Sequence, residues 1–572
     1  MRTVFSYLKP HLPRMTAGLV IKFVGTMMDL LLPWILSYMI DDIVPLKNKT
    51  LIFLWGGAMV ICAVVAVAGN IIANRMASRV AQRTTQALRH DLFEKISYLS
   101  CRQADGFSVP SLESRLTTDT YNLHQMIGMM QRLGIRAPIL LLGGIFVTLT
   151  LEPYLSLVLI AMLPFMGLTI YAISKKGIPL YARLQQGIDT MVRTVRENIS
   201  GIRVIKALSK TDFERERFAG VNAEVVARET RSGVTMALSN PLMNLLLNLG
   251  LTLVIIVGAF RVNAGLTQPG KIIAFLTYFT IILNALLSIS RMFMMYSKGS
   301  ASAGRISEVL NTPEDMQLHP PVIKDSALHI AFSNVSFSYR KKRDNLTDIS
   351  FALKRGETLG IIGGTGSGKT TIAALLMRLY DPDSGEILIS GRSVASIPPA
   401  ELHTKFGVVF QHDFLMADTI ANNISFGRGL SMEQIKAACE RAQAREFIEG
   451  LPGQYAYMLT AKGTNLSGGQ KQRLLVARAL AGSPEILILD DSSSALDYRT
   501  DSLLRRAVSQ HFQNTTTIII AQRISSIRHA DHILVLEDGK SLGYGTHREL
   551  METCGLYREI SISQMGGDVI AG

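Results

Sequence analysis

The sequence predicts an α-helical membrane domain of six long transmembrane helices, followed by a soluble α/β domain. Hydrophobic residues make up 48% of the 572 residues and charged residues only 18%, a balance that suits a chain partly within lipid. Long apolar runs lie before residue 311, and a glycine-rich turn in an α/β pattern lies beyond them. We expect the transmembrane domain with cytoplasmic helix extensions at 1–310, a proline-containing linker at 311–327 and the α/β domain at 328–572.

Six segments are long and apolar enough to be membrane spans. Crossing the hydrocarbon core takes about 20 mostly apolar residues. The predicted spans are Leu19–Ile40, Thr50–Asn74, Ala137–Leu151, Pro153–Ser174, Ser232–Phe260 and Ile272–Ser290. The third is short alone, but extends back through Met126–Leu133 if Arg132 and Arg136 are sheltered. The N-terminal segment lacks the features of a cleavable signal peptide.

Basic residues gather in the two long stretches between spans, 75–136 and 175–231. The other three connectors are short. The positive-inside rule places both long stretches and both termini in the cytoplasm, as in a multi-pass protein of the cell (inner or cytoplasmic) membrane. This topology explains much of the net charge of +14, so no nucleic-acid partner is needed to account for it.

The two long stretches are expected to extend the spans as helices. Apolar residues from Ile188 to Ile205 recur at steps of three or four, which is one face of a helix. A helix from Pro153 to about Lys210 would be about 85 Å long, against a bilayer of about 45 Å. We expect the chain to reverse near Asp105–Pro110 and Ser209–Phe218, at tips placed to contact a cytoplasmic domain.

A phosphate-binding loop is predicted where the α/β domain begins. The strand-like Thr358–Ile362 precedes GGTGSGKT, which fits G-x-x-x-x-G-K-[ST] in its required strand–loop–helix context. Backbone N–H groups of such a loop close on phosphates. Lys369 is expected to reach the β- and γ-phosphates of ATP, and the Thr370 hydroxyl to bind Mg²⁺. The predicted nucleotide-binding residues of this loop are Gly363, Gly364, Thr365, Gly366, Ser367, Gly368, Lys369, Thr370 and Thr371.

A second element is the run ILILDD, Ile486–Asp491. Its continuous apolar character is typical of a parallel strand covered on both faces. Asp490, at the end of the strand, is a candidate ligand for hydrated Mg²⁺. Taken alone, this pattern more often marks an ordinary strand that ends at a polar turn.

The third motif is LSGGQ, with Ser467, Gly468, Gly469 and Gln470 as further candidate nucleotide-binding residues. The order of phosphate loop, LSGGQ, acidic strand and SALD (494–497) resembles an ABC ATPase domain, and Tyr339 in VSFSY and Gln411 in GVVFQ also match. With the six preceding helices, the chain resembles a half-transporter of the type IV exporter architecture. It resembles the degenerate-site subunit of heterodimeric bacterial multidrug exporters.

The resemblance implies residue roles and a second subunit. Tyr339 would stack on adenine, and Gln411 would approach Mg²⁺ and the attacking water. Ser467 and Gly469 would contact the γ-phosphate of ATP held by the opposite subunit, and Asp497 would cross the dimer interface. Two ATP molecules would be sandwiched between two domains, so a partner chain would be obligatory.

Three positions depart from the family pattern. Where the family usually has Glu after the acidic-strand Asp, this chain has Asp491, whose carboxylate is withdrawn by about 1.5 Å. A general base must lie within about 2.6–3.2 Å of its proton, and supplies about 10²–10⁴-fold in rate, or about 3–5 kcal/mol. Gln522 replaces the usual His and cannot carry an imidazolium charge. Ala461 replaces the acidic residue that usually precedes LSGGQ.

These departures suggest a division of labour between two subunits. The chain's own site keeps the groups that bind ATP and Mg²⁺, while Asp491, Gln522 and Gln411 stand at the catalytic positions. This site would hydrolyse ATP slowly or not at all. The intact LSGGQ would complete a competent site whose remaining groups come from a second, non-identical ABC half-transporter.

The substrate is less well defined than the ATP site. The leading reading is export of small hydrophobic or amphipathic compounds, as in multidrug efflux. A peptide or lipid exporter half and an ATP-gated regulator that does not transport are the alternatives. Asp29 lies within a span, where a charge is expensive. It would either face a cavity, where it touches a cationic substrate or gates the path, or pair with Lys22 or with an arginine across the bundle.

Overall fold

The computed structural model describes residues 1–320, 327–339, 341, 344–411, 413–492 and 498–565. The chain divides into two compact units. The first comprises Met1–Tyr98 and Val109–Thr312, and the second comprises Leu99–Ser108 and Pro313–Gly572. A short segment between the two halves of the first unit therefore packs with the second unit.

The first unit is helical. Among the described residues, six helical segments are long and apolar enough to cross a membrane, which confirms the six predicted spans. Its helices are α1 (Arg2–Leu8), α2 (Leu12–Tyr38), α3 (Lys49–Ser97), α5 (Val109–Ser114), α6 (Thr120–Leu133), α7 (Arg136–Leu151), α8 (Pro153–Ser200), α9 (Ile202–Ala207), α10 (Thr211–Ala237), α11 (Ser239–Asn263) and α12 (Pro269–Leu310). Shorter 3₁₀ or π turns occur at Lys9–His11, Met39–Ile43, Val44–Leu46 and Arg115–Asp119.

Helices α2, α3, α6 and α12 pack against one another, and α8 and α11 pack beside α12. Large apolar side chains fill the contact of α8 and α11 with α12, including the buried Leu155, Phe275 and Phe279. Gly250 lets the Phe279 ring approach α11 closely, because a Cβ there would lie 2.3 Å from a ring carbon. Small residues at helix contacts are a common means of close packing within membranes.

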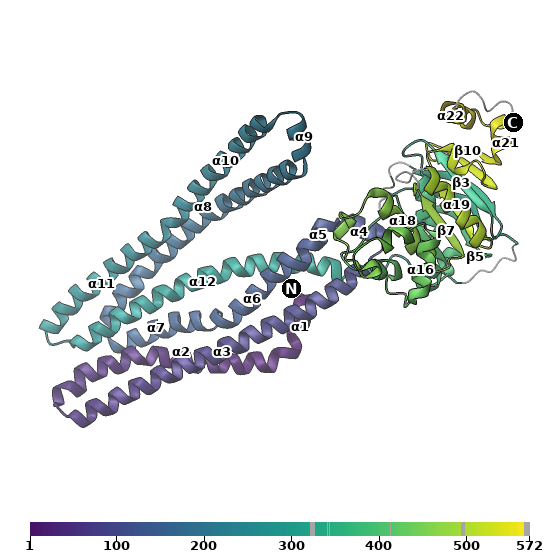
Figure 1. The fold of residues 1–572 in the computed structure, drawn as a ribbon. Helices are drawn as coiled ribbons and strands as arrows, with labels where there is room; N and C mark the ends of the chain where they lie inside the picture. Colours follow the sequence, from purple (N-terminus) through teal and green to yellow (C-terminus); the bar gives the residue numbers. More distant parts are fainter. Residues whose placement is uncertain (321–326, 340, 342–343, 412, 493–497, 566–572) are drawn as a thin grey trace. The chain divides into compact units, whose positions relative to one another are not determined.

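Helices α8 and α10 run side by side away from this bundle to a tip at α9 (Figure 1). Pro164 and Pro179 lie within α8 without ending it. The predicted single helix from Pro153 to about Lys210 is broken at Gly201, between α8 and α9. Glycine is a poor helix former, which accounts for the break. The chain reverses just beyond α9, where Ser209 has a φ of +51°, as the sequence predicts.

The second unit contains two sheets over the described residues. A mostly parallel sheet has the order β10-β9-β3-β8-β7-β6, and an antiparallel sheet has the order β2-β1-β4-β5. The strands are β1 (Ile330–Phe337), β2 (Leu346–Leu353), β3 (Thr358–Gly363), β4 (Ser384–Ile389), β5 (Arg392–Ser393), β6 (Phe406–Val409), β7 (Ile486–Asp490), β8 (Thr516–Ile520), β9 (His532–Glu537) and β10 (Lys540–Gly545). This arrangement confirms the predicted α/β class.

Short helices surround these sheets. They are α4 (Cys101–Phe107), α13 (Lys369–Leu376), α14 (Pro399–Thr404), α15 (Ile420–Ser425), α16 (Met432–Arg441), α17 (Arg445–Glu449), α18 (Gly468–Leu480), α19 (Tyr498–His511), α20 (Ile524–Ile527), α21 (His547–Thr553) and α22 (Gly555–Met565). Every residue of β7 is buried, as expected of its continuous apolar run.

The strand order explains why distant motifs meet. Strand β8 lies between β3 and β7 with parallel register on both sides, so that Ile520 pairs with both Ile361 and Asp490. The carboxyl ends of the three strands therefore share one edge. Ligands of open α/β sheets bind at such an edge. The phosphate loop, the two acids after β7 and Gln522 after β8 all follow these strand ends.

Helix α4 is the segment from the first half of the chain that packs within the second unit. Its Gln103 donates a 2.6 Å hydrogen bond to the Pro313 carbonyl, and Ser100 donates one of 2.9 Å to Asp315. Arg102 lies 3.8 Å from Asp383. The first predicted tip, near Asp105–Pro110, does contact the α/β part of the chain.

Candidate nucleotide-binding site

A pocket of about 220 Å³ opens at the carboxyl ends of β3, β7 and β8. It brings together residues from four separate sequence motifs. Its lining residues are Asn345, Thr365, Gly366, Gly368, Lys369, Thr370, Thr371, Gln411, Asp490, Asp491, Ile520, Ala521 and Gln522. A larger cavity of about 830 Å³ beside α19 contains none of the predicted site residues.

The glycine-rich loop adopts a conformation that suits phosphate binding. Gly366 and Gly368 have φ angles of +84° and +100°, and a Cβ on Gly368 would lie 2.5 Å from the Leu346 side chain. The Lys369 ammonium donates hydrogen bonds to the carbonyls of Gly363 and Gly364, at 2.9 and 2.7 Å. These bonds hold the ammonium over the loop. A bound phosphate would take the place of the two carbonyls and form a charge pair with the ammonium.

Burial is the main influence on Lys369, and it lowers the pKa of the ammonium. The carboxylates of Asp490 and Asp491 act in the opposite direction. The lysine therefore sits in a partly desolvated position facing two acids. A triphosphate bound at the loop would favour its charged form.

Thr370 and Asp490 lie together as expected of a magnesium-binding pair. The Thr370 hydroxyl donates a 2.7 Å hydrogen bond to Oδ2 of Asp490, whose residue is only 2% exposed. The buried hydroxyl of Ser367, in the same loop, has no hydrogen-bond partner among the described residues. A hydroxyl–carboxylate pair and an unsatisfied loop hydroxyl fit a nucleotide triphosphate with Mg²⁺.

The two residues that depart from the family pattern contact each other. The Gln522 side-chain amide lies 3.4 Å from Oδ2 of Asp491, to which it donates a hydrogen bond. Asp491 has a φ of +49°, and its backbone N–H donates to the Ile520 carbonyl at 2.9 Å. An amide that donates to this carboxylate occupies one of the lone pairs that a general base would use.

Tyr339 lies beside the phosphate-loop helix. Its hydroxyl donates to Oγ1 of Thr371 at 3.3 Å, and its ring contacts that of Tyr380 edge-on, with centroids 5.0 Å apart. The residue is 38% exposed. Burial raises the pKa of the Tyr339 hydroxyl, so the group is neutral at physiological pH.

The signature residues form the start of a helix and do not line this pocket. Ser467 caps α18: its Oγ accepts from the Gln470 N–H at 3.3 Å, and the Gln470 side chain accepts from the Ser467 N–H at 2.9 Å. Gly468 and Gly469 make the first turn. Asp497, predicted to reach a partner, lies outside the described residues.

Two residues at or beside the pocket are not predicted from the sequence. Asn345 lines the pocket, and its Oδ1 accepts from the Tyr339 N–H at 3.1 Å. Gln564, on α22, donates to the backbone carbonyl of Gln522 at 2.8 Å and accepts from the Ile524 N–H at 2.8 Å. Neither belongs to a motif, and Gln564 is 42 residues from Gln522. No local signal in the sequence identifies them.

In the first unit, the partner of Asp29 is an arginine. Oδ2 of Asp29 lies 3.1 Å from Arg136 Nη2, and the Asn70 amide lies 3.4 Å away. Lys22 instead donates to the Asn74 side chain at 3.0 Å. Of the two ion-pair partners that the sequence leaves open for Asp29, an arginine across the bundle is therefore the one found.

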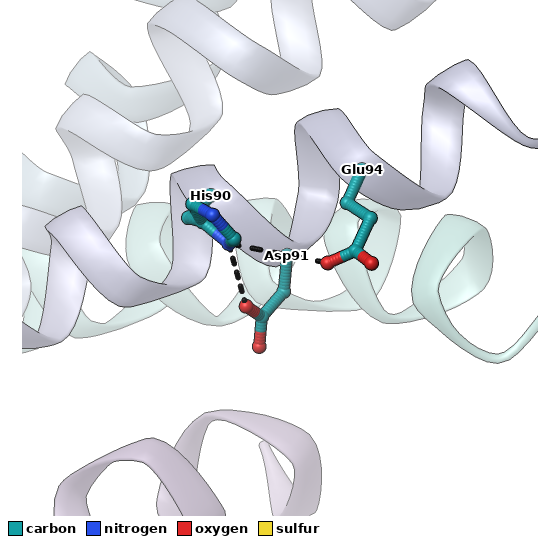
Figure 2. Close-up of side chains that lie close together, drawn as sticks. All are labelled: His90, Asp91 and Glu94. Atoms are coloured by element: carbon teal, nitrogen blue, oxygen red, sulfur yellow. Dashed lines mark hydrogen bonds and ion pairs between the residues drawn. The ribbon is translucent and has the colours of Figure 1, made fainter.

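A separate cluster of possible metal ligands lies on one exposed turn of α3 (Figure 2). Nδ1 of His90 lies 3.3 Å from Asp91 and 4.0 Å from Glu94. All three residues are exposed, and the other oxygen of Asp91 accepts a 2.7 Å hydrogen bond from Tyr7. Exposed groups of this kind need no ion, so we assign no metal to them.

Comparisons with known proteins agree with this architecture. Residues 15–286 match the family model of the ABC transporter transmembrane region, and residues 346–494 match that of the ABC transporter. The chain is similar to two Bacillus subtilis (strain 168) proteins described as uncharacterized ABC transporter ATP-binding proteins. YfiB is 35% identical over 99% of each chain, and YknU is 36% identical over 84% of this chain and 82% of its own. Among solved structures, a bacterial Atm1-family ABC exporter with ATP bound matches with a TM-score of 0.82 and 25% identity, over 98% of this chain and 99% of that one.

Proposed function

Because this chain belongs to the ABC transporter family, as an ATP-driven exporter half with a transmembrane domain fused to an ABC ATPase domain, we propose that it works in a heterodimer with a non-identical half-transporter. ABC exporters work as dimers. The observation that carries the proposal is the contact of Gln522 with Asp491, at a pocket that also contains Lys369, Thr370 and Asp490.

In this proposal the chain's own pocket holds ATP. Lys369 and the loop N–H groups bind the phosphates, Tyr339 stacks on adenine, and Thr370, Asp490 and Gln411 hold the magnesium ion. When bound there, Mg²⁺ would neutralise negative charge on the phosphates. The Thr370–Asp490 distance of 2.7 Å supports this assignment.

Hydrolysis in this pocket would be slow because both catalytic groups are altered. The Asp491 carboxylate is one methylene shorter than that of glutamate, and Gln522 donates to it instead of leaving it free to accept a proton from water. Gln522 also lacks the positive charge of a protonated histidine. The site would therefore retain ATP and contribute little turnover.

The chain's contribution to catalysis would lie in its signature. The reciprocal bonds between Ser467 and Gln470 fix the start of α18, with its N–H groups and positive dipole end directed outward. Such a helix end suits the γ-phosphate of ATP held by the partner. One competent site per complex would then drive transport.

The substrate that we propose is a small hydrophobic or amphipathic compound, as in multidrug-type efflux. Both termini and the two long helical extensions would lie in the cytoplasm, following the distribution of basic residues. Peptide or lipid export is the alternative within transport, and an ATP-gated regulator is the alternative outside it. Inverted vesicles distinguish the ATP-gated regulator from a transporter, since only a pump accumulates a fluorescent dye in an ATP-dependent manner.

The decisive experiment compares ATPase activity of the purified chain alone with that of its complex with the half-transporter encoded beside it. The chain alone should be nearly inactive. In the complex, Asp491→Ala should change turnover less than twofold, and Ser467→Ala should reduce it at least tenfold.

A matched control is available for the cap. Ser431 caps α16 through the same reciprocal bonds, with Gln434, and lies elsewhere in the domain. Ser431→Ala removes an equivalent helix cap and should leave turnover intact. Brisk ATPase from the chain alone, or equal losses from the two serine variants, would refute the proposal.

A further inference from the structure

A group of three cations and one carboxylate lies inside the first unit. Lys22 on α2 is within electrostatic range of Arg132, Arg136 and Asp29. Only Arg136 forms an ion pair with Asp29, at 3.1 Å. Within the part of the chain that the structure describes, neither Lys22 nor Arg132 has an ion-pair partner. Three positive charges against one negative charge leave an excess of two.

These cations are held in place by the fold. Lys22 is 2% exposed, and its ammonium donates to Asn74 Oδ1 at 3.0 Å. Asn70 bridges to Asp29, yet its own Oδ1 is buried without a partner among the described residues, as is Nε of Arg136. Buried polar atoms are nearly always satisfied. Nε of Arg136 is a donor without an acceptor, so this cation lacks a hydrogen-bond partner that an anion could supply, whereas Asn70 Oδ1 is an acceptor without a donor.

The position of the cluster makes this excess costly. Lys22 and Asp29 lie within the first predicted span, and Arg132 and Arg136 belong to the extended third span. Charged side chains at membrane depth normally pair or face a water-filled cavity. The Arg136 side chain is 37% exposed and that of Asp29 23%. Because hydrocarbon cannot solvate this pair, we take its exposed side to face an aqueous cavity.

We propose that Lys22, Arg132 and Arg136 form a binding site for the anionic group of an amphipathic compound, a carboxylate or a phosphate. This inference rests on the proposed function, since it specifies the chemistry of the exported compound. Asp29 is the resident counter-ion, and the incoming anion competes with it for Arg136. The apolar part of the compound lies along the neighbouring span surface. The site reverses the cationic preference that Asp29 alone would suggest.

Two sources supply such an anion: an exported compound and an anionic lipid headgroup. The same cations would hold either. Their contributions can be separated by reconstituting the complex in nanodiscs of phosphatidylcholine alone or with added phosphatidylglycerol. Weaker probe binding in the presence of phosphatidylglycerol assigns the site to lipid headgroups, and unchanged binding assigns it to the exported compound.

The test measures equilibrium binding without ATP, using three dansyl-labelled undecyl probes that differ only in their end group. The end groups are a carboxylate, a neutral amide and a trimethylammonium. The complex with the partner half-transporter should bind the carboxylate probe about tenfold more tightly than the other two. Each of Lys22→Gln, Arg132→Gln and Arg136→Gln should reduce that preference several-fold.

Two further variants separate binding from structure. Asp29→Asn removes the competing carboxylate, so it should tighten binding of the carboxylate probe, whereas loss of a structural ion pair would weaken it. Lys175→Gln is the matched control, because Lys175 is an exposed cation on α8 and should not affect the preference. Equal binding of the three probes by the wild-type complex, or weaker carboxylate binding by Asp29→Asn, would overturn the inference.

Failure of the function and failure of this site can be told apart. ATP-dependent accumulation of any of the probes in inverted vesicles supports export whether or not the carboxylate is preferred. Preferential carboxylate binding that persists without any ATP-dependent accumulation supports the site and contradicts export.

Discussion

The hydroxyl of Tyr380 donates a 2.7 Å hydrogen bond to Oδ2 of Asp105, on α4. The Tyr380 ring contacts Tyr339 edge-on, and the Tyr339 hydroxyl reaches Thr371 on the phosphate-loop helix. A continuous path of three contacts thus joins α4, which the chain forms between two membrane-unit helices, to the nucleotide pocket. All residues of this path belong to the second unit, and we expect it to make the position of α4 depend on whether the pocket is filled.

Removing the first contact should reduce transport without weakening ATP binding. Tyr380→Phe keeps the ring stack and deletes only the bond to Asp105, a charged acceptor worth about 1.5–3 kcal/mol. We expect transport by the complex to fall about fivefold or more, with ATP binding unchanged. Dye accumulation and ATP affinity are measured on the same preparation. Tyr544→Phe, which deletes a tyrosine bond to the Ala352 carbonyl elsewhere in the unit, should leave both unchanged.

Restoring the two altered catalytic groups should activate the chain's own pocket. Asp491→Glu extends the carboxylate toward the attacking water, and Gln522→His restores a group that can carry positive charge. Because both residues line the same pocket, the double variant should gain more than the product of the single gains. In a complex whose partner half-transporter carries an inactivated ATP site, we expect the ATPase activity to rise at least tenfold.

The control is the same pair of substitutions in a chain that also carries Lys369→Ala. That variant loses the ammonium that we propose binds phosphate, so its activity should return to the wild-type level. If Asp491→Glu and Gln522→His leave the rate unchanged while ATP still binds, the low activity has another cause than these two side chains.

The sequence could predict the parts of the fold that depend on patterns among neighbouring residues. Apolar runs and basic connectors give the six spans, and the loop from Gly363 to Thr370 gives the nucleotide pocket, because each pattern reflects short-range chemistry. The break at Gly201 was the exception. A strong periodic pattern continues across it, and only the weak helix propensity of glycine marks the end of α8.

What the sequence could not predict depends on contacts between distant segments. Gln564, on α22 and 42 residues further along the chain, holds the backbone at Gln522, and Asn345 reaches the pocket from just before β2. The ion-pair partner of Asp29 could not be predicted for the same reason. The choice between Lys22 and an arginine across the bundle depends on the packing of α2 against α7, which places Arg136 beside Asp29.

A buried histidine should make the second unit less stable in acid. Burial and the nearby Arg355 lower the pKa of His329, Glu485 opposes this, and Lys405 adds to it. The unfolded chain, with a pKa of about 6.5, therefore binds the proton more readily than the folded chain. The free energy of unfolding should be fully retained above about pH 6.5 and should fall as the pH drops below it.

The measurement is thermal unfolding of the complex at pH 7.5 and 5.5. His329→Asn cannot titrate and keeps a polar group near Thr516, whose hydroxyl lies 2.6 Å from His329 Nδ1. The fall in Tm on acidification should be smaller in this variant by about 2–3 °C. His511→Asn, an exposed residue at the end of α19, should show the wild-type fall. An identical fall in all three proteins would exclude His329 as the source.

A buried ion pair should stabilise the membrane unit at the short connector between α7 and α8. Arg261 Nη2 lies 2.8 Å from Glu152 Oε1, with side chains 19% and 7% exposed, and the guanidinium also lies over the Tyr154 ring, 4.3 Å from its centroid. Arg261→Met would leave the Glu152 carboxylate buried and uncompensated, which costs about 3–5 kcal/mol. We expect the Tm of the complex to fall by about 5–10 °C.

Two comparisons identify the cause of that loss. Arg217 pairs with Glu197 at 3.0 Å, but both side chains are about half exposed, so Arg217→Met should lower the Tm by less than about 2 °C. Adding Glu152→Gln to Arg261→Met removes the orphaned charge and should recover most of the stability, because the penalty comes from the unpaired carboxylate more than from the lost attraction. If the double variant is as unstable as Arg261→Met alone, the arginine acts through its packing on Tyr154 instead.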